Sequence, residues 1–284
     1  MTTPIVQEQV SLQAYNTLAV PVKTRWFIEA NTHQDIVFAL AFVREQQCPL
    51  LVLGGGSNVV LVDDIAGLTL HVNTRGVSIE NETDTTVLLS VAAGENWHDT
   101  VMYCVEQSWC GVENLALIPG SVGAAPIQNI GAYGVELTQC FSYLEAIEIS
   151  TGKVQRFGRD ACQFAYRDSV FKQQAKDQYV ITRVVLALSK QSQWHIHYPA
   201  LQERLAAIEA SELSSAVIAQ AVIDIRRSKL PDPVDIPNAG SFFKNPIVSA
   251  ECYRDIKRQY PHIIAYAQDT QPPTYKLAAG WLLD

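Results

Sequence analysis

The spacing of apolar and polar residues over the first part of the chain predicts a small α/β unit. Thr24–Ala30 has the apolar pattern of a strand. Thr32 followed by Asp35 is a helix-start pattern, in which each side chain can bond the other residue's backbone N–H. The helix beyond it is indicated by apolar residues at helical spacing: Ile36, Val37, Leu40 and Val43. Pro49–Leu53 suits a buried strand and is followed by a glycine turn and a second apolar run, Val59–Val62.

From Leu68 onward the pattern is richer in strands and predicts an α+β domain of mixed topology. The apolar or alternating runs are Leu68–Val72, Val87–Ala92, Tyr143–Ile149, Val154–Phe157 and Tyr179–Leu188. Helices are expected at about Trp97–Ser108, Ala200–Glu209 and Ser215–Arg227. The segment Leu230-Pro231-Asp232-Pro233 cannot continue a helix and predicts a domain boundary. We therefore expect three parts: residues 1–67, 68–228 and 229–284.

Composition and charge restrict the class of ligand. The 284 residues are 48% hydrophobic and 18% charged, which is ordinary for a globular protein. The net charge of −8 argues against nucleic-acid binding, which needs a basic surface. Positive charge is local, at Arg226, Arg227, Lys229 and Lys244. A few cations in an acidic chain suit a small anionic ligand better than a polymer.

The chain has the features of a cytoplasmic protein. Its six cysteines form no C-x-x-C pair, which predicts free thiols in a reducing compartment. The N-terminal residues lack the basic and apolar regions of a signal peptide. The longest uncharged run, Asn114–Val135, contains two prolines and four glycines, so we expect no membrane helix there.

Two glycine-rich segments are candidates for ligand binding. Gly54–Asn58 contains three consecutive glycines, which permit positive φ and let backbone N–H groups approach a phosphate. It lacks the Rossmann glycine spacing, and a plain strand–turn–strand is the alternative. Leu117–Gly134 is uncharged and has many backbone donors that need partners. A large flat ligand with many acceptors would supply them; an ordinary packed loop is the alternative.

Three further segments carry polar groups that could act on a ligand. Arg167, between Tyr166 and Asp168, could present its guanidinium to a carboxylate, or form a surface ion pair. The cations of Arg226–Lys229 end a helix, where the helix dipole alone favours them. Ser241 follows Gly240 in a turn and lacks the G-x-S-x-G context of a hydrolase nucleophile. It could donate a proton in a dry site made by the two phenylalanines that follow, or play a turn role.

His195 and His197 would lie on one face of a strand and could bind a metal ion. The spacing suggests no third ligand, so we expect no metal site.

Taken in order, these motifs resemble those of the type I UDP-N-acetylenolpyruvoylglucosamine reductases. The resemblance rests on Gly-Gly-Gly-Ser-Asn at 54, Ile-Pro-Gly-Ser-Val-Gly at 118, Tyr-Arg-Asp-Ser at 166, Lys-Leu-Pro-Asp-Pro at 229 and Asn-Ala-Gly-Ser-Phe-Phe-Lys-Asn-Pro at 238. It implies an α+β fold with a two-part, vanillyl-alcohol-oxidase-like FAD-binding region and a C-terminal substrate-binding domain. FAD would be bound non-covalently, the chain would be a monomer, and no nucleic acid or membrane partner is implied.

The resemblance also implies roles for individual residues. Arg167 and Ser241 correspond to catalytic positions, and Tyr198, Lys229 and Asn245 to contacts with the UDP-sugar. The positions implied for FAD are Gly54, Gly55, Gly56, Ser57, Asn58, Pro119, Gly120, Ser121, Gly123, Ala124, Gln128, Asn129, Gly131, Tyr133 and Arg226.

The implied reaction belongs to peptidoglycan synthesis. NADPH would reduce FAD, and hydride from flavin N5 would add to C3 of UDP-N-acetylglucosamine enolpyruvate. Arg167 would stabilise the charge that develops at C2 and the carboxylate, and Ser241 would protonate C2 to give UDP-N-acetylmuramate.

One expected element is missing from the pattern. The family's third catalytic group is a glutamate beyond a helix that Lys276–Asp284 resembles, and the chain stops on that helix. We therefore expect a truncated substrate-binding domain. The alternative to an active reductase is a catalytically impaired FAD- and UDP-sugar-binding fragment. A related flavin oxidase is disfavoured because the glycine loop has no histidine to attach flavin.

Overall fold

The computed structural model describes residues 4–268 and 270–283, and the chain divides along its sequence into two compact units between Ala239 and Gly240. Residues 1–3 and Asp284, on which the expectations for the two chain ends partly rest, lie outside the described residues. The division into residues 1–67, 68–228 and 229–284 stays a prediction.

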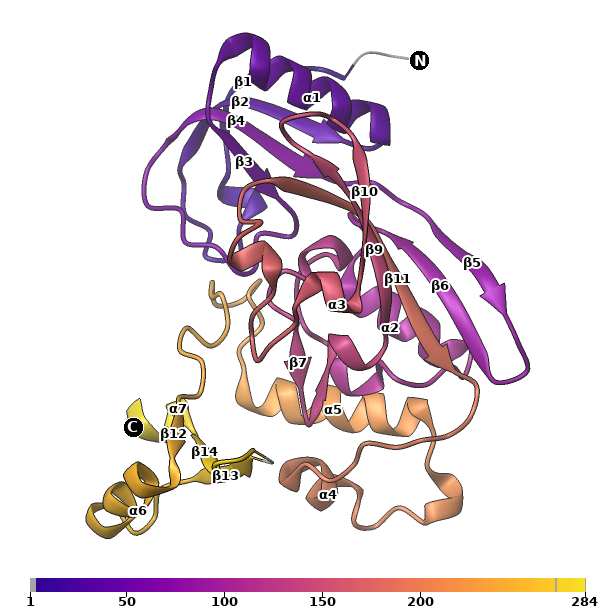
Figure 1. Ribbon diagram of the computed structural model, residues 1–284, viewed down its shortest axis with the longest axis vertical. Coiled ribbons are helices and arrows are strands. Elements are labelled where there is room, and N and C mark those ends of the chain that lie inside the picture. The colour runs from indigo at the N-terminus through magenta and orange to yellow at the C-terminus, as the bar shows by residue number, and fades with distance from the viewer. Residues whose placement is uncertain (1–3, 269, 284) are drawn as a thin grey trace. The chain divides into compact units, whose positions relative to one another are not determined.

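The first unit begins with a four-stranded sheet in the order β1-β2-β4-β3. Its strands are β1 (Gln7–Ser11), β2 (Lys23–Ala30), β3 (Leu50–Leu53) and β4 (Ile65–Val72). β2 and β3 both run parallel to β4, whereas β1 is antiparallel to β2. Helix α1 (His33–Gln46) packs on β2 and β4 (Figure 1). The predicted strands and helix of a small α/β unit are present, but its sheet also contains β4, whose apolar run Leu68–Val72 the sequence pattern assigns to the next part of the chain.

The start of α1 follows from its sequence. The Thr32 hydroxyl accepts from the Asp35 backbone N–H at 3.2 Å, and the Asp35 carboxylate accepts from the Thr32 N–H at 2.9 Å. This reciprocal pair satisfies N–H groups that the helix itself leaves unbonded. Ile36, Ala39 and Leu40 then share one buried face against the sheet.

The second sheet of the first unit is antiparallel throughout, in the order β10-β9-β11-β6-β5. Its strands are β5 (Val77–Glu82), β6 (Thr86–Ala92), β9 (Phe141–Glu148), β10 (Val154–Gly158) and β11 (Tyr179–Ser189). A short hairpin lies between them in sequence, made of β7 (Gly131–Ala132) and β8 (Val135–Glu136). The helices of this part are α2 (Trp97–Glu106), α3 (Arg159–Cys162), α4 (Pro199–Leu205) and α5 (Ser215–Lys229).

Helix α5 packs against α2 and α4 and buries one face in a core that also holds β6, β9 and β11 (Figure 1). The shorter 3-10 helices of the chain are Gln13–Tyr15, Glu113–Leu115, Val122–Ala124, Leu137–Gln139, Val170–Lys172 and Ala210–Glu212. No helix among the described residues is both long enough and apolar enough to cross a membrane.

The second unit contains a small antiparallel sheet in the order β12-β14-β13. Its elements are β12 (Ile247–Ser249), α6 (Ala250–Gln259), β13 (Ala265–Gln268), β14 (Thr274–Leu277) and α7 (Ala279–Leu283). Tyr253 of α6 stacks on Tyr275 of β14 with ring centroids 4.0 Å apart.

Two predictions of local structure are wrong. His195 and His197 lie on an irregular segment between β11 and α4, because the strand ends at Ser189 and the following backbone is held instead by a side chain, Asn114. The helix expected from Lys276 begins only at Ala279, because Lys276 and Leu277 still pair in the sheet. The described residues hold no cluster of three potential metal ligands.

Candidate functional site

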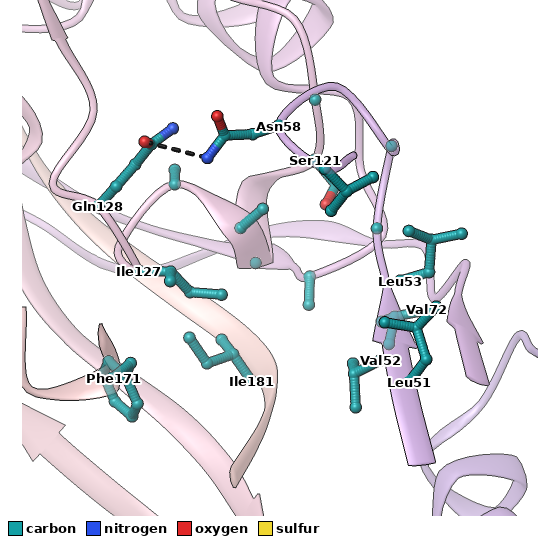
Figure 2. A pocket seen from close by; sticks show the side chains of 18 of the residues that line it. Leu51, Val52, Leu53, Asn58, Val72, Ser121, Ile127, Gln128, Phe171 and Ile181 are labelled. Atoms are coloured by element: carbon teal, nitrogen blue, oxygen red, sulfur yellow. Dashed lines mark hydrogen bonds between the residues drawn. The ribbon is translucent and has the colours of Figure 1, made fainter. Parts of the chain in front are cut away.

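A cavity of about 750 Å³ lies in the first unit, between the end of the first sheet and the loop that follows α2. Its walls come from β3, the glycine loop after β3, the loop at 119–130, and the segment from the Val170–Lys172 helix to β11. Figure 2 shows apolar side chains on both sides of the space, among them Leu51, Leu53, Ile127, Phe171 and Ile181. The cavity is therefore apolar over much of its wall and polar at the glycine loops.

The two glycine-rich segments lie in direct backbone contact. A Cβ atom on Gly55 would lie 2.9 Å from Gly120 Cα, and one on Gly54 would lie 2.3 Å from the Ser121 hydroxyl oxygen. Gly56 has a φ of +62°, and a Cβ there would lie 2.0 Å from the carbonyl oxygen of Tyr15. Only glycine fits at these positions, because a side chain at Gly55 would push the two loops apart and one at Gly56 would push the glycine loop off Tyr15.

This site fits a ligand with a phosphate group and a flat aromatic ring. Gly54, Gly55 and Gly56 line the cavity and have no side chains, so a ligand can approach their backbone closely, as in anion-binding loops. Asn58 Nδ2 donates to Gln128 Oε1 at 3.1 Å and joins the two loops at the cavity rim (Figure 2). Beside the loop, the Thr17 hydroxyl is buried without a hydrogen-bond partner among the described residues, while the Thr17 N–H donates to Gly56.

The loop at 119–130 is held in place through the backbone of Leu117, which precedes it and has a φ of +59°. Its N–H donates to His98 Nδ1 at 3.1 Å, and its carbonyl accepts from Arg226 Nε at 3.2 Å. Burial lowers the pKa of His98, and the charges of Arg227 and Arg226 add to that effect, which favours the neutral ring that can accept this bond. Arg226 does not line the cavity; it supports the loop that does.

Several residues expected to contact a cofactor hold the loop together instead of lining the cavity. Asn129 is fully buried, and its amide donates to Glu136 Oε2 at 2.8 Å and to the Ala165 carbonyl at 3.1 Å. Its oxygen accepts from the Thr138 N–H at 3.0 Å. Gly131 and Tyr133 are likewise outside the cavity wall. The expected residues that do line it are Gly54, Gly55, Gly56, Ser57, Asn58, Pro119, Gly120, Ser121, Gly123, Ala124 and Gln128.

Arg167 lies in a strained turn beside the β7–β8 hairpin. Its φ is +56°, a left-handed conformation that is uncommon for a residue with a side chain. Its guanidinium donates to the carbonyl of Gly131, and Nη1 lies 3.7 Å from Glu136 Oε1. About 30% of the side chain is exposed. The contacts with Gly131 and Glu136 hold the guanidinium beside the hairpin, and the side chain remains partly exposed.

Tyr198 and Lys229 each lie at one end of a helix in the first unit. Tyr198 precedes the first residue of α4, and its ring meets that of Tyr133 edge-on, with centroids 5.3 Å apart. Lys229 is the last residue of α5 and is exposed. Asn114 links the hairpin to the segment before Tyr198, because its Nδ2 donates to the carbonyls of Tyr133 at 3.0 Å and His195 at 2.7 Å.

In the second unit Ser241 lies on an exposed irregular segment after Gly240, whose φ is +70°. Phe242 is 82% exposed, and its ring meets that of Phe243 edge-on. Asn245 Oδ1 accepts from the Ala279 N–H at 2.9 Å and so caps the start of α7. Asn245 therefore has a structural contact that the sequence pattern did not indicate.

The sequence pattern also missed part of the cavity wall. Lys172, Lys176 and Asp177 line it, and Lys172 Nζ donates to the carbonyl of Arg167 at 3.0 Å. No local signal distinguishes these lysines from surface lysines, since only the fold brings them to the glycine loops.

Comparison with known proteins agrees with this geometry. Residues 24–158 match the FAD binding domain family. A UDP-N-acetylenolpyruvoylglucosamine reductase of Pseudomonas putida is 44% identical over 98% of this chain and 81% of its own length. The reductase of Amoebophilus asiaticus is 43% identical over 98% of this chain and 82% of its length.

Solved structures agree in fold. The UDP-N-acetylenolpyruvylglucosamine reductase of Thermus caldophilus aligns with a TM-score of 0.62 over 97% of this chain and 88% of its own, at 20% identity. A solvent-stable cholesterol oxidase aligns with a TM-score of 0.50 over 66% of this chain and 38% of its own, at 12% identity. The expected two-part FAD-binding fold of the vanillyl-alcohol-oxidase-like type is confirmed. The cavity fits FAD as its cofactor.

Proposed function

Because this chain belongs to the UDP-N-acetylenolpyruvoylglucosamine reductase family, a family of flavin-dependent oxidoreductases, we propose that it reduces UDP-N-acetylglucosamine enolpyruvate to UDP-N-acetylmuramate with NADPH as the reductant. The observation that carries this proposal is the cavity between the two glycine loops. Its backbone donors suit the pyrophosphate of FAD, and its apolar walls suit the rest of the cofactor. When bound, FAD would supply the hydride for C3 of the enolpyruvyl group, with NADPH as the source of that hydride.

Arg167 is proposed to stabilise the negative charge that develops at C2 and on the carboxylate of the substrate. A guanidinium suits a carboxylate because it offers parallel N–H donors in a fixed plane. The strained turn and the partial exposure of Arg167 support this role. A preorganised cation at the developing charge lowers the barrier without reorganisation during the reaction.

Ser241 is proposed to give its hydroxyl proton to C2, which completes the addition of hydride and proton across the double bond. The exposed segment of Ser241 leaves the hydroxyl accessible to a ligand. Tyr198, Lys229 and Asn245 are proposed to contact the UDP-sugar. For Lys229, its exposed position at the end of α5 supports a contact with phosphate.

The test is turnover by the FAD-loaded chain. We expect NADPH oxidation that depends on the enolpyruvyl sugar, with UDP-N-acetylmuramate identified by mass spectrometry. Yellow protein that binds FAD but oxidises no NADPH after the sugar is added would contradict the proposal, and it would identify the chain as a binding protein only.

A further inference from the structure

Asn129, Glu136 and Arg167 form a connected polar set in the first unit, although 38 positions separate the first from the last. Asn129 is 0% exposed, and its Nδ2 donates at 2.8 Å to Glu136 Oε2. The other carboxylate oxygen of Glu136 lies 3.7 Å from Arg167 Nη1. One buried amide therefore fixes the carboxylate that faces the guanidinium.

The same amide also fixes the backbone that carries the arginine. Asn129 Nδ2 donates to the carbonyl of Ala165, and Ala165 and Asp168 exchange two backbone hydrogen bonds of 3.1 Å around Arg167. Lys172 Nζ donates to the Arg167 carbonyl at 3.0 Å. These contacts hold Arg167 in its left-handed conformation, which is otherwise unfavourable.

The hairpin is shaped to receive this side chain. A Cβ atom on Gly131 would lie 2.7 Å from Arg167 Nη1 and 2.9 Å from Glu136 Cγ, so a side chain there would displace the guanidinium or its carboxylate. Arg167 also donates to the Gly131 carbonyl. The guanidinium is thus held from two sides by groups that belong to one rigid turn.

The spacing of the ion pair leaves the guanidinium able to bind a second anion. At 3.7 Å the contact with Glu136 is longer than a normal hydrogen bond, and about 30% of the arginine side chain is exposed. A bidentate pair at hydrogen-bonding distance would instead occupy the donors that a carboxylate needs. The arrangement therefore orients the Arg167 guanidinium and leaves it N–H donors for a second anion.

We propose that Glu136, fixed by Asn129, is the positioning residue that orients the Arg167 guanidinium for the carboxylate of the enolpyruvyl substrate. The inference rests on the proposed function, because it takes the carboxylate from that substrate. Without Glu136 the long arginine side chain would sample several rotamers, and a misplacement of the order of 1 Å costs up to roughly 100-fold in rate.

The test uses Glu136→Gln in the full FAD-loaded chain. Glutamine keeps the length of the side chain and an oxygen for the Asn129 hydrogen bond, but it removes the charge. Glu145→Gln is the matched control, since Glu145 pairs with Arg183 at 2.8 Å and Arg156 at 3.1 Å on the second sheet. We measure FAD content, the melting temperature, and the binding of two ligands by the change in flavin absorbance.

The two ligands are UDP-N-acetylglucosamine enolpyruvate and UDP-N-acetylglucosamine, which lacks the carboxylate. We expect Glu136→Gln to weaken binding of the first by about 10-fold or more and to leave binding of the second and the FAD content unchanged. Glu145→Gln should change neither affinity. A structural role of Glu136 alone would shift the melting temperature or both affinities together, and would overturn the inference.

Unchanged or tighter binding of the enolpyruvyl sugar by Glu136→Gln also overturns it, because Glu136 would then be idle or a competitor of the substrate. Wild-type protein that does not discriminate between the two ligands overturns it as well, since Arg167 would then meet no carboxylate. Wild-type protein that discriminates but does not turn over refutes the proposed function only, and the binding comparison still decides the role of Glu136.

Discussion

Replacing Gly56 by alanine should displace the glycine loop that lines the cavity, and Gly152→Ala provides a control with the same backbone strain. Gly56 has a φ of +62° and Gly152 a φ of +73°, so each alanine pays the same left-handed penalty of about 1–2 kcal/mol. A Cβ on Gly152 meets no atom within 4 Å, whereas one on Gly56 lies 2.0 Å from the Tyr15 carbonyl oxygen. The difference between the variants isolates that clash.

The clash cannot be relieved by moving Tyr15. The turn that follows it is fixed by Asn16, whose Nδ2 donates to the Leu12 carbonyl at 2.7 Å and whose Oδ1 accepts from Val20 at 3.0 Å. The glycine loop must therefore shift away from Tyr15, which moves the part of the cavity wall that it forms. Overpacking of this kind costs about 1–3 kcal/mol, so Gly56→Ala should destabilise the chain by roughly 2–5 kcal/mol in total.

The assay combines urea unfolding with FAD content, measured as the ratio of flavin to protein absorbance after purification and as the dissociation constant from flavin fluorescence. We expect Gly152→Ala to bind FAD like the wild type and Gly56→Ala to be largely colourless. Equal FAD affinity in the two variants would refute the argument that the close packing of the glycine loop against Tyr15 shapes the cofactor site.

Three other predictions concern separate parts of the chain. Ser241→Ala should leave flavin reduction by NADPH intact and slow reduction of the sugar severely; equal loss of both steps, measured by stopped-flow absorbance, would contradict the proton-donor role. Binding of the UDP-sugar should weaken as salt is raised, and a salt response unchanged by Lys229→Gln would exclude Lys229 as a phosphate contact. Burial raises the pKa of Glu113, although backbone hydrogen bonds from Gly111 and others oppose the shift, so the folded chain holds this proton more tightly than the unfolded chain. Stability is then lost as the pH rises from the unfolded pKa through the raised folded pKa. The urea midpoint of Glu113→Gln should therefore gain on that of the wild type as the pH is raised; a pH-independent difference would count against a buried, destabilising charge.

Elements with a buried face could be predicted from sequence, and elements without one could not. The capping pair of Thr32 and Asp35 and the apolar runs of the central strands have local signals that the fold retains. Strand β5, in contrast, has only two apolar residues, Val77 and Ile79, and is exposed at every residue, so its short alternation marks no buried face. It is defined by its pairing with β6.

The candidate site shows the same division. The glycine loops could be identified because close backbone approach requires glycine, a property that the sequence displays. Asn129 has the same local context as Gln128, yet Gln128 faces the cavity and Asn129 is buried against Glu136 and Ala165. The partner at Ala165 is distant in sequence, so no local pattern could assign Asn129 to support instead of ligand contact.

The cavity has a thermodynamic consequence for the protein as a whole. Its walls belong to both sheets of the first unit, so a ligand that fills it contacts both and binds the folded chain far better than the unfolded one. A ligand at 100 times its dissociation constant adds about 2.7 kcal/mol of stability by mass action. Apo protein is then the form most exposed to proteolysis, and the steady-state amount of this protein in a cell should follow its supply of flavin.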